Sequence, residues 1–178
     1  MKRLLVTIDY DETADTLVPQ ALSELLGLIR DETKELFKEI GFVIITARHE
    51  VRGSSLFTYC PKVPLLEAII QAPESRDGRP GREINDMLFH PLQKGVSIDN
   101  FRRRYRNSDF VVVDDLRTAG LNKFRKLETF LGKNPNPWPT RVFSFVRSTS
   151  NSLALSQSQR CLPKQIAEAL RHNVGDPI

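Results

Sequence analysis

Residues 4–13, LLVTIDYDET, join a short apolar run to a cluster of acids. A run this short, rich in β-branched residues and ended by acids, predicts a buried parallel strand. In an open α/β sheet, ligands bind beyond the carboxyl ends of the strands, so Asp9 and Asp11 stand where chemistry is usually done. Two like charges this close repel unless a cation or a shared proton offsets them. A bound divalent metal would complete the site, although a plain acidic turn also fits this stretch alone.

Two further apolar runs of the same kind follow. Residues 42–45 are ended by Thr46, and residues 110–113 are ended by two acids. Between the first two runs, apolar residues recur at helical spacing from Val18 to Ile40, and Gly41 is expected to end that helix. Strand, helix and strand in this order predict a parallel sheet with right-handed crossovers. The expected fold class is therefore a three-layer, Rossmann-like α/β fold with a central parallel sheet and helices on both faces.

The 178 residues divide into two expected parts. Residues 1–147 are predicted to form one α/β domain, and residues 148–178 a Ser/Gln-rich linker followed by a C-terminal helix. Within the domain, residues 50–95 have the least regular pattern and leave room for a small insert. Residues 63–71 in that region are expected to form a short helix.

The composition indicates a globular protein, with 40% hydrophobic and 27% charged residues. No apolar run approaches the length of a membrane span, so no membrane partner is expected. Cys60 and Cys161 lie far apart in the sequence, which argues against a disulfide framework or a zinc ribbon and favours a cytoplasmic protein. The net charge of +4 fits a phosphorylated substrate, and it also fits nucleic acid as a partner.

Polar side chains follow each of the three strands. They are Asp9 and Asp11, Thr46 and Arg48, and Asp114 and Asp115. Because the carboxyl ends of parallel strands share one edge of a sheet, we expect these six residues to converge. Four carboxylates in one crevice need a cation, and hard oxygen donors without His or Cys point to Mg²⁺. The hydroxyl of Thr46 and the guanidinium of Arg48 would serve a phosphate group.

The ordered set of motifs resembles the haloacid dehalogenase (HAD) superfamily of phosphohydrolases, in particular its small capless or minimally capped members. The first motif of that family, Asp-x-Asp-x-Thr after an apolar strand, is matched by residues 9–13, and the second, an apolar strand ending in Thr, by residues 42–46. The fourth, an apolar strand ending in two acids, is matched by residues 110–115. The third is a lysine upstream of that last strand, where Lys94 is the first choice and Lys62 and Lys123 are rivals.

The resemblance implies a role for each matched residue. Asp9 would be the nucleophile that forms an aspartyl phosphate, and Asp11 the general acid and base. Thr46 and Lys94 would contact the phosphoryl group. Mg²⁺ would be held by four residues, which are Asp9, the carbonyl of Asp11, Asp114 and Asp115. Arg48 is added as a second phosphate contact from this sequence alone and not from the family.

The expected function is therefore that of a Mg²⁺-dependent phosphatase. It would hydrolyse a phosphomonoester, on a nucleotide, a nucleic-acid end or a phosphoprotein, through an aspartyl phosphate. The alternative is a non-catalytic domain with a HAD-like fold that binds nucleic acid or a protein through the arginines of residues 102–106. Such a cluster is more often a solvated helix face.

Overall fold

The computed structural model describes residues 2–73, 87–132, 140–149 and 151–173. Within these ranges one sheet contains six strands, in the spatial order β4-β3-β2-β1-β5-β6. The strands are β1 (Arg3–Asp9), β2 (Glu39–Thr46), β3 (Leu66–Gln71), β4 (Leu88–Pro91), β5 (Asp109–Asp114) and β6 (Val142–Ser144). The helices are α1 (Pro19–Thr33), α2 (Ser55–Tyr59), α3 (Ile98–Tyr105), α4 (Arg117–Phe130) and α5 (Gln157–His172), with 3₁₀ turns η1 (Ala14–Thr16) and η2 (Cys60–Lys62). In the described ranges, none of the helices combines the length and the apolar character needed to cross a membrane.

The sheet is parallel except for β4, which pairs antiparallel with β3 at one edge. From β1 the chain crosses to β2 on one side and returns later to β5 on the other side of β1. The order of the strands therefore reverses between β1 and β5, and ligands bind outside the carboxyl ends of the strands at such a point. The predicted fold class is confirmed, with β4 as an addition that the sequence did not indicate.

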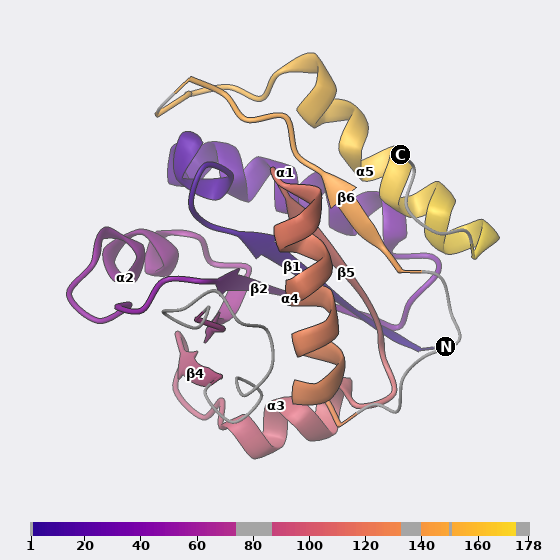
Figure 1. Cartoon of the computed structure of the whole chain (residues 1–178). Helices are drawn as coiled ribbons and strands as arrows, with labels where there is room; N and C mark the ends of the chain where they lie inside the picture. The colour runs from indigo at the N-terminus through magenta and orange to yellow at the C-terminus, as the bar shows by residue number, and fades with distance from the viewer. Residues whose placement is uncertain (1, 74–86, 133–139, 150, 174–178) are drawn as a thin grey trace.

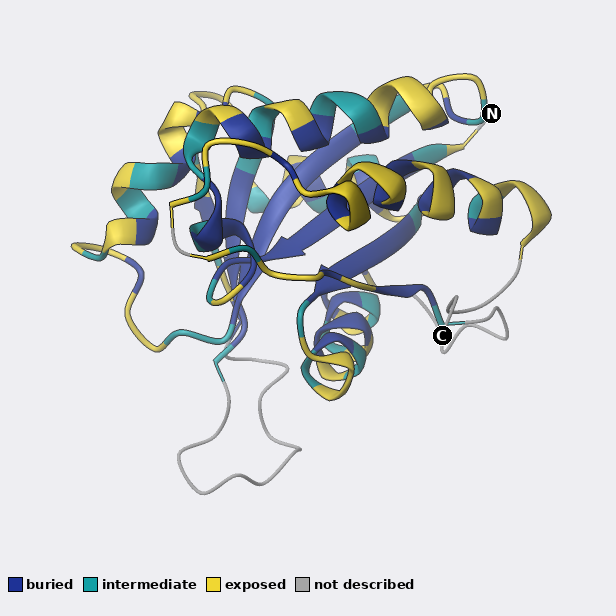
Figure 2. Cartoon of the chain, turned by 90° about the horizontal axis from the view of Figure 1, so that it is seen from above, coloured by how far each residue is buried: buried dark blue, intermediate teal, exposed yellow. Residues whose placement is uncertain are grey.

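Helices cover both faces of the sheet, with α4 on one face and α1 and α5 on the other (Figure 1). The central strands are buried on both faces, as their continuous apolar runs predict. Along β1, Val6 and Ile8 belong to the core shared with α1 and α5, whereas Leu5 belongs to the core shared with α3 and α4. The strands lie between helices whose outer faces are exposed (Figure 2).

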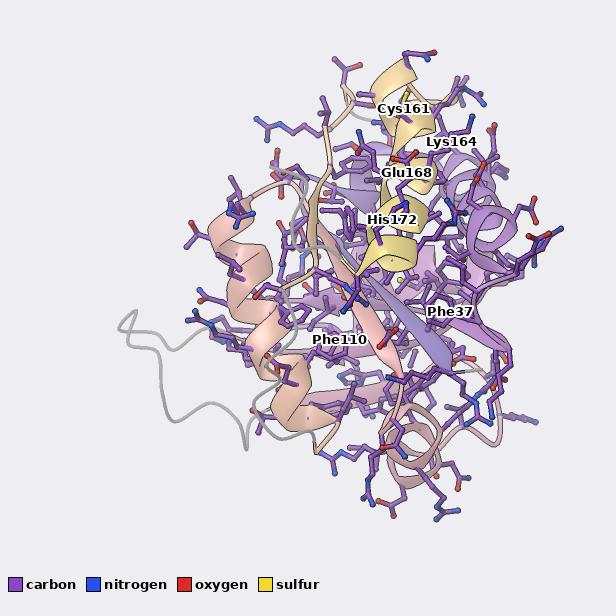
Figure 3. All side chains as sticks on the ribbon, turned by 90° about the vertical axis from the view of Figure 1, so that its right-hand side faces the viewer. Phe37, Phe110, Cys161, Lys164, Glu168 and His172 are labelled. Atoms are coloured by element: carbon purple, nitrogen blue, oxygen red, sulfur yellow. The ribbon has the colours of Figure 1, made fainter. Side chains whose placement is uncertain are left out.

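The C-terminal helix α5 packs onto the same domain and does not stand apart from it. Ser156 and Gln159 form a capping box at its start, where each side chain bonds the other residue's backbone N–H. Ser152, in the expected linker, exchanges backbone hydrogen bonds with Thr16 and Val18 beside α1. The prediction for residues 148–178 is thus right about a helix, but the described residues before it are docked and do not form a loose linker. The outer face of α5 carries exposed Cys161, Lys164, Glu168 and His172 (Figure 3).

Residues 50–95 contribute β3 and β4, the two strands at one side of the sheet. The expected helix of residues 63–71 is in fact β3, which lies between β2 and β4. Its apolar run is short and buried, and such a run has no periodicity that separates strand from helix. Residues 74–86 of the expected insert lie outside the described residues.

Helix α1 ends at Thr33, so Gly41 does not cap it and lies instead in β2. A side chain at Gly41 would overlap the hydroxyl of Tyr105 on α3. Tyr105 is fully buried, and its hydroxyl donates to a carboxylate oxygen of Glu67 at 2.9 Å. The glycine is therefore required by the close approach of α3 to β2 and not by a helix end.

Replacing Gly41 with alanine is expected to destabilise the fold by about 1–3 kcal/mol, the usual cost of overpacking a well-packed core. Tyr105 cannot swing aside without giving up its hydrogen bond to Glu67. The matched control is Gly27→Ala in α1, where an added methyl group meets nothing within 4 Å and should stabilise the helix by about 0.5–1 kcal/mol. Urea unfolding of both variants measures the difference, and equal effects would contradict this role of Gly41.

Candidate active site at the carboxyl ends of β1 and β5

Three carboxylates meet where β1 and β5 end. Asp9 is the last residue of β1, Asp114 is the last residue of β5, and Asp115 follows it. One carboxylate oxygen from each of the three lies within 4.8 Å of the others. Asp9 and Asp114 are buried, and Asp115 is half-buried. Asp9 is separated from the other two acids by more than 100 positions in the sequence, yet all three lie together at the point where the strand order reverses. This cluster of three carboxylates at the carboxyl ends of β1 and β5 is called the acidic crevice below.

The ammonium group of Lys123 lies between two of these carboxylates. Its Nζ donates to Asp9 Oδ1 at 2.5 Å and to Asp114 Oδ2 at 2.8 Å. Helix α4 carries Lys123 and begins three residues after Asp114, whose Oδ1 accepts the backbone N–H of Leu116 at 2.9 Å. This bond fixes the turn from β5 into α4 and so directs the second turn of the helix back over the strand end.

Lys94, the first choice for the lysine of the site, lies elsewhere. It is exposed in the turn after β4. β4 runs antiparallel to β3, and Pro91 at its end pairs with Ala68 near the start of β3. The turn after β4 therefore lies at the amino ends of the parallel strands, opposite to the carboxyl ends that carry Asp9 and Asp114. Of its two rivals, Lys62 lines a separate pocket, so Lys123 is the lysine that the structure brings to Asp9.

Thr13 also belongs to the site, although its sequence pattern predicts no role for it beyond its place in the motif. Its hydroxyl lies 3.0 Å from Asp9 Oδ2 and 3.2 Å from Asp115 Oδ1, and its single proton can serve either carboxylate. The turn that brings Thr13 back over β1 has Glu12 in the left-handed region, at φ 63°. The only signal in the sequence was the hydroxyl four residues after Asp9, which is common in turns of every kind.

Asp11 and Arg48 form an ion pair at the rim of the site. The guanidinium group contacts both oxygens of Asp11 at 2.7–2.9 Å and lies 5.2 Å from the ring centroid of Tyr10. Thr46, fully buried at the end of β2, accepts the backbone N–H of Arg48 on its hydroxyl oxygen at 3.2 Å. The predicted phosphate contacts Thr46 and Arg48 therefore lie together, and Arg48 is bound to Asp11.

A buried amide holds the loop that carries Arg48. Gln71, the last residue of β3, donates from Nε2 to the carbonyls of Arg48 and His49 at 3.0 Å and 2.7 Å. Its Oε1 lies 3.0 Å from Nε2 of His90 on β4. Burial lowers the pKa of His90, and the charge of Arg52 lowers it further, so the imidazole is neutral near pH 7 and donates to Gln71. The unpredicted strands β3 and β4 thus position the loop after β2.

The carboxylates perturb one another and the lysine. Burial raises the pKa of Asp9 to about 7; Lys123 opposes this shift, and the charge of Asp114 adds to it. Burial and then the hydrogen bond and charge of Asp114 raise the pKa of Asp115. Burial alone would lower the pKa of Lys123, but Asp9 and Asp114 outweigh it, so the pKa is raised and the ammonium form is favoured. A buried acid with so high a pKa in a crevice is typical of functional sites.

The donor set fits a hard divalent cation. When ionised, three carboxylates and one ammonium group leave a formal charge of −2 (three negative, one positive) within a few ångströms. Carboxylate oxygens are the ligands that Mg²⁺ prefers, and no His or Cys belongs to this cluster. A cation with two positive charges would balance the site. Lys123 offsets only part of the negative charge.

The arginines of residues 102–106 serve partly internal contacts. Arg102 donates to the carbonyl of Phe130 at 2.9 Å and lies over its ring at 4.5 Å. Arg104 pairs with Glu39 and, at 3.2 Å, with Glu67. Arg103 and Arg106 are exposed. Two of the four arginines therefore hold α3 onto the sheet and α4, which reduces the charge available to an external partner.

Comparison with known proteins assigns no family to the chain. No family model matches the sequence, and no curated protein matches it. Among solved structures, the chain is similar to a flavodoxin from Streptococcus pneumonia TIGR4, with 12% sequence identity, 97% of this chain and 99% of that chain covered, and a TM-score of 0.34. Flavodoxin-like sheets have the strand order 2-1-3-4-5, whereas the parallel strands here follow 3-2-1-4-5 when counted along the chain.

The identification as a HAD superfamily member is therefore wrong, because neither a family model nor a curated relative supports it and a solved structure that matches the chain is a flavodoxin. The motifs that suggested it were acids and a threonine at strand ends, which any ligand-binding doubly wound sheet can carry. The lysine also departs from the expected order. Lys123 contacts Asp114 but follows β5 in the sequence, whereas Lys94, which precedes β5, lies at the opposite ends of the strands. Only the geometry and charge of the crevice then bear on the function of this protein.

Proposed function

We propose that this protein is a Mg²⁺-dependent phosphatase that hydrolyses a phosphomonoester with Asp9 as the nucleophile. The observation that carries the proposal is the buried Asp9 carboxylate, which shares one crevice with the oxygens of Asp114 and Asp115 within 4.8 Å. The position at the reversal of strand order supports a ligand site there. The charge of the cluster supports a divalent cation.

The reaction would run in two steps. In the first, an oxygen of Asp9 forms a bond to phosphorus while the bond from phosphorus to the ester oxygen breaks, and Asp11 gives a proton to the leaving oxygen. In the second, water gives a proton to Asp11 and attacks the same phosphorus. The acyl phosphate bond breaks, phosphate leaves, and the Asp9 carboxylate is restored.

Other residues of the chain orient these groups. Lys123 and Thr13 hold the two oxygens of Asp9, which fixes the direction of attack. The hydroxyl of Thr46 accepts a bond from Arg48 N–H, so its own proton can be donated to a phosphoryl oxygen. Mg²⁺ held by Asp9, Asp114 and Asp115 would supply positive charge that offsets the charge on the phosphoryl oxygens.

Arg48 and Asp11 would exchange partners when substrate binds. In the structure both oxygens of Asp11 are engaged by the guanidinium group. A phosphoryl group carries more negative charge than one carboxylate and suits the same bidentate contact. Transfer of Arg48 to the phosphate would leave Asp11 able to take a proton and act as the general acid.

Hydrolysis of p-nitrophenyl phosphate by the purified protein, with Mg²⁺ and with EDTA, tests the proposal. Turnover with Mg²⁺ that EDTA abolishes supports it. No turnover under either condition would contradict it. Binding of nucleic acid by such an inactive protein, weakening steeply with salt, would favour the non-catalytic alternative.

Arg48→Gln is expected to raise KM for the phosphate ester by about tenfold or more, because charge-assisted hydrogen bonds are worth about 1.5–3 kcal/mol, with a smaller effect on kcat. The matched control is Arg160→Gln, since Arg160 forms an exposed ion pair with Glu24 between α5 and α1. Steady-state kinetics of both variants measure the effect. A KM for Arg48→Gln equal to that of the control would exclude this contact.

A further inference from the structure

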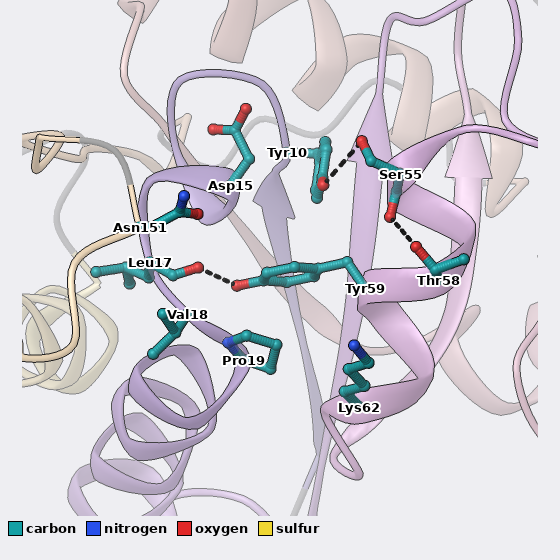
Figure 4. A pocket seen from close by; sticks show the side chains of 10 residues that line it. All are labelled: Tyr10, Asp15, Leu17, Val18, Pro19, Ser55, Thr58, Tyr59, Lys62 and Asn151. Atoms are coloured by element: carbon teal, nitrogen blue, oxygen red, sulfur yellow. Dashed lines mark hydrogen bonds between the residues drawn. The ribbon is translucent and has the colours of Figure 1, made fainter.

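A pocket of about 380 Å³ lies beside the acidic crevice, between the loop after β1 and helix α2 (Figure 4). Its volume falls in the range of small-molecule sites, about 300–1,000 Å³. Residues that line it include Tyr10, Asp15, Ser55, Thr58, Tyr59 and Lys62. None of the steps proposed above uses these side chains, so the pocket is available for another part of the substrate.

Two fixed aromatic rings form part of the wall. The rings of Tyr10 and Tyr59 meet edge to face, with centroids 5.4 Å apart and planes at 75°. The hydroxyl of Tyr59 lies 2.8–2.9 Å from the carbonyl oxygens of Ala14 and Leu17, and that of Tyr10 lies 3.4 Å from Ser55 Oγ. Tyr10 is only 3% exposed and supports Tyr59 from behind. The half-buried ring of Tyr59, held in this way, loses little entropy on binding and offers a surface to a flat, aromatic ligand.

Polar groups of both signs complete the wall. One carboxylate oxygen of Asp15 is buried and has no hydrogen-bond partner among the described residues. A buried acceptor without a partner is costly, and a ligand with an N–H or O–H donor would satisfy this carboxylate after a small rotation. Lys62 and the hydroxyl of Thr58 come from η2 and α2 on the other side of the pocket (Figure 4).

The pocket and the acidic crevice share a wall. Tyr10 stands between Asp9 and Asp11 in the chain, and the guanidinium group of Arg48 lies over its ring. A phosphate bound at Asp9 and Arg48 would therefore lie on one side of Tyr10, and the rest of the molecule could extend past it toward Tyr59. The volume admits a nucleoside-sized group but not a folded protein or a nucleic-acid duplex.

We propose that this pocket binds the nucleoside of a nucleoside monophosphate, with the base against Tyr59. This inference rests on the proposed phosphatase function for the placement of the phosphate. The base supplies the flat aromatic face, and its amino group or the ribose hydroxyls supply the donors for Asp15. A sugar phosphate lacks the first of these features, and a phosphopeptide exceeds the volume.

The test uses Thr58→Trp, which fills the pocket from an exposed position of α2. The matched control is Thr129→Trp on α4, an exposed helical threonine whose hydroxyl bonds a preceding carbonyl in the same way. Binding of cytidine monophosphate is measured by calorimetry in EDTA. Hydrolysis of cytidine monophosphate and of acetyl phosphate, whose leaving group needs no pocket, is measured with Mg²⁺.

Thr58→Trp is expected to lower both the affinity for cytidine monophosphate and its kcat/KM by about tenfold or more, which is the scale of one lost base–aromatic contact. Acetyl phosphate hydrolysis and the control should stay unchanged. Two results would contradict the nucleoside pocket and leave the phosphatase proposal in place. One is hydrolysis of acetyl phosphate by a protein that does not bind cytidine monophosphate. The other is equal binding of cytidine monophosphate by Thr58→Trp and wild type. If wild type binds cytidine monophosphate and Thr58→Trp does not, but wild type hydrolyses neither compound, the nucleoside pocket is supported and the phosphatase proposal is contradicted.

Discussion

Replacing Lys123 with methionine is expected to destabilise the protein by about 3–5 kcal/mol, the usual cost of removing one partner from a buried ion pair. The ammonium group is almost fully buried and contacts Asp9 and Asp114 at 2.5 Å and 2.8 Å. Without it, three carboxylates remain together with no positive charge among them, and the pKa of Asp9, which Lys123 lowers, rises further. Urea unfolding at pH 8 in EDTA measures the loss.

The matched control for this prediction is Lys164→Met on α5. Lys164 is exposed on the outer face of that helix, so its loss should change the stability by about 0.5 kcal/mol or less. Mg²⁺ should stabilise Lys123→Met more than wild type, because the variant has one more uncompensated negative charge. Equal stabilities of the two variants, with equal responses to Mg²⁺, would show that Lys123 does not neutralise the site.

Asp9→Asn is expected to lower kcat by about four orders of magnitude or more, the scale seen when a nucleophile is removed. The same change should leave the fold intact and stabilise it at pH 8 in EDTA. Burial raises the pKa of Asp9 from 3.8 to about 7. Folding thus favours the protonated carboxyl, and stability declines as pH rises from about 4 through 7.

Asparagine mimics the protonated acid, so Asp9→Asn should lack this decline and exceed wild type in stability above pH 7. Below pH 4 the two proteins should be equally stable. The control is Asp99→Asn, an exposed acid in the first turn of α3. Urea unfolding across this pH range, beside the phosphatase assay, measures both effects. Retained activity, or stability lost in parallel with activity, would contradict the role of Asp9.

The convergence of Asp9, Asp114 and Asp115 could be predicted because it needs only two facts. Each acid ends an apolar run that forms a parallel strand, and parallel strands in one sheet present their carboxyl ends at one edge. The residues that hold these acids were harder to predict. Lys123 reaches Asp9 only because α4 turns back over β5, and the direction of that turn depends on the Asp114 bond to Leu116 N–H.

Several elements were mispredicted for identifiable reasons. The apolar run of β3 is too short to show either period, so the sequence pattern of residues 63–71 does not separate a strand from the helix predicted there. Gly41 follows a helical pattern but serves the contact with Tyr105, a partner 64 positions later. The HAD assignment failed because a set of residues at strand ends defines a ligand-binding edge and not a family.

Crystals soaked with Mn²⁺, an anomalous scatterer that takes the same oxygen ligands as Mg²⁺, test the central claim most directly. We predict one anomalous peak among the carboxylates of Asp9, Asp114 and Asp115, absent from crystals of Asp114→Asn. No peak at this crevice, with Lys123 still between Asp9 and Asp114, would contradict the claim that the three acids hold a divalent cation.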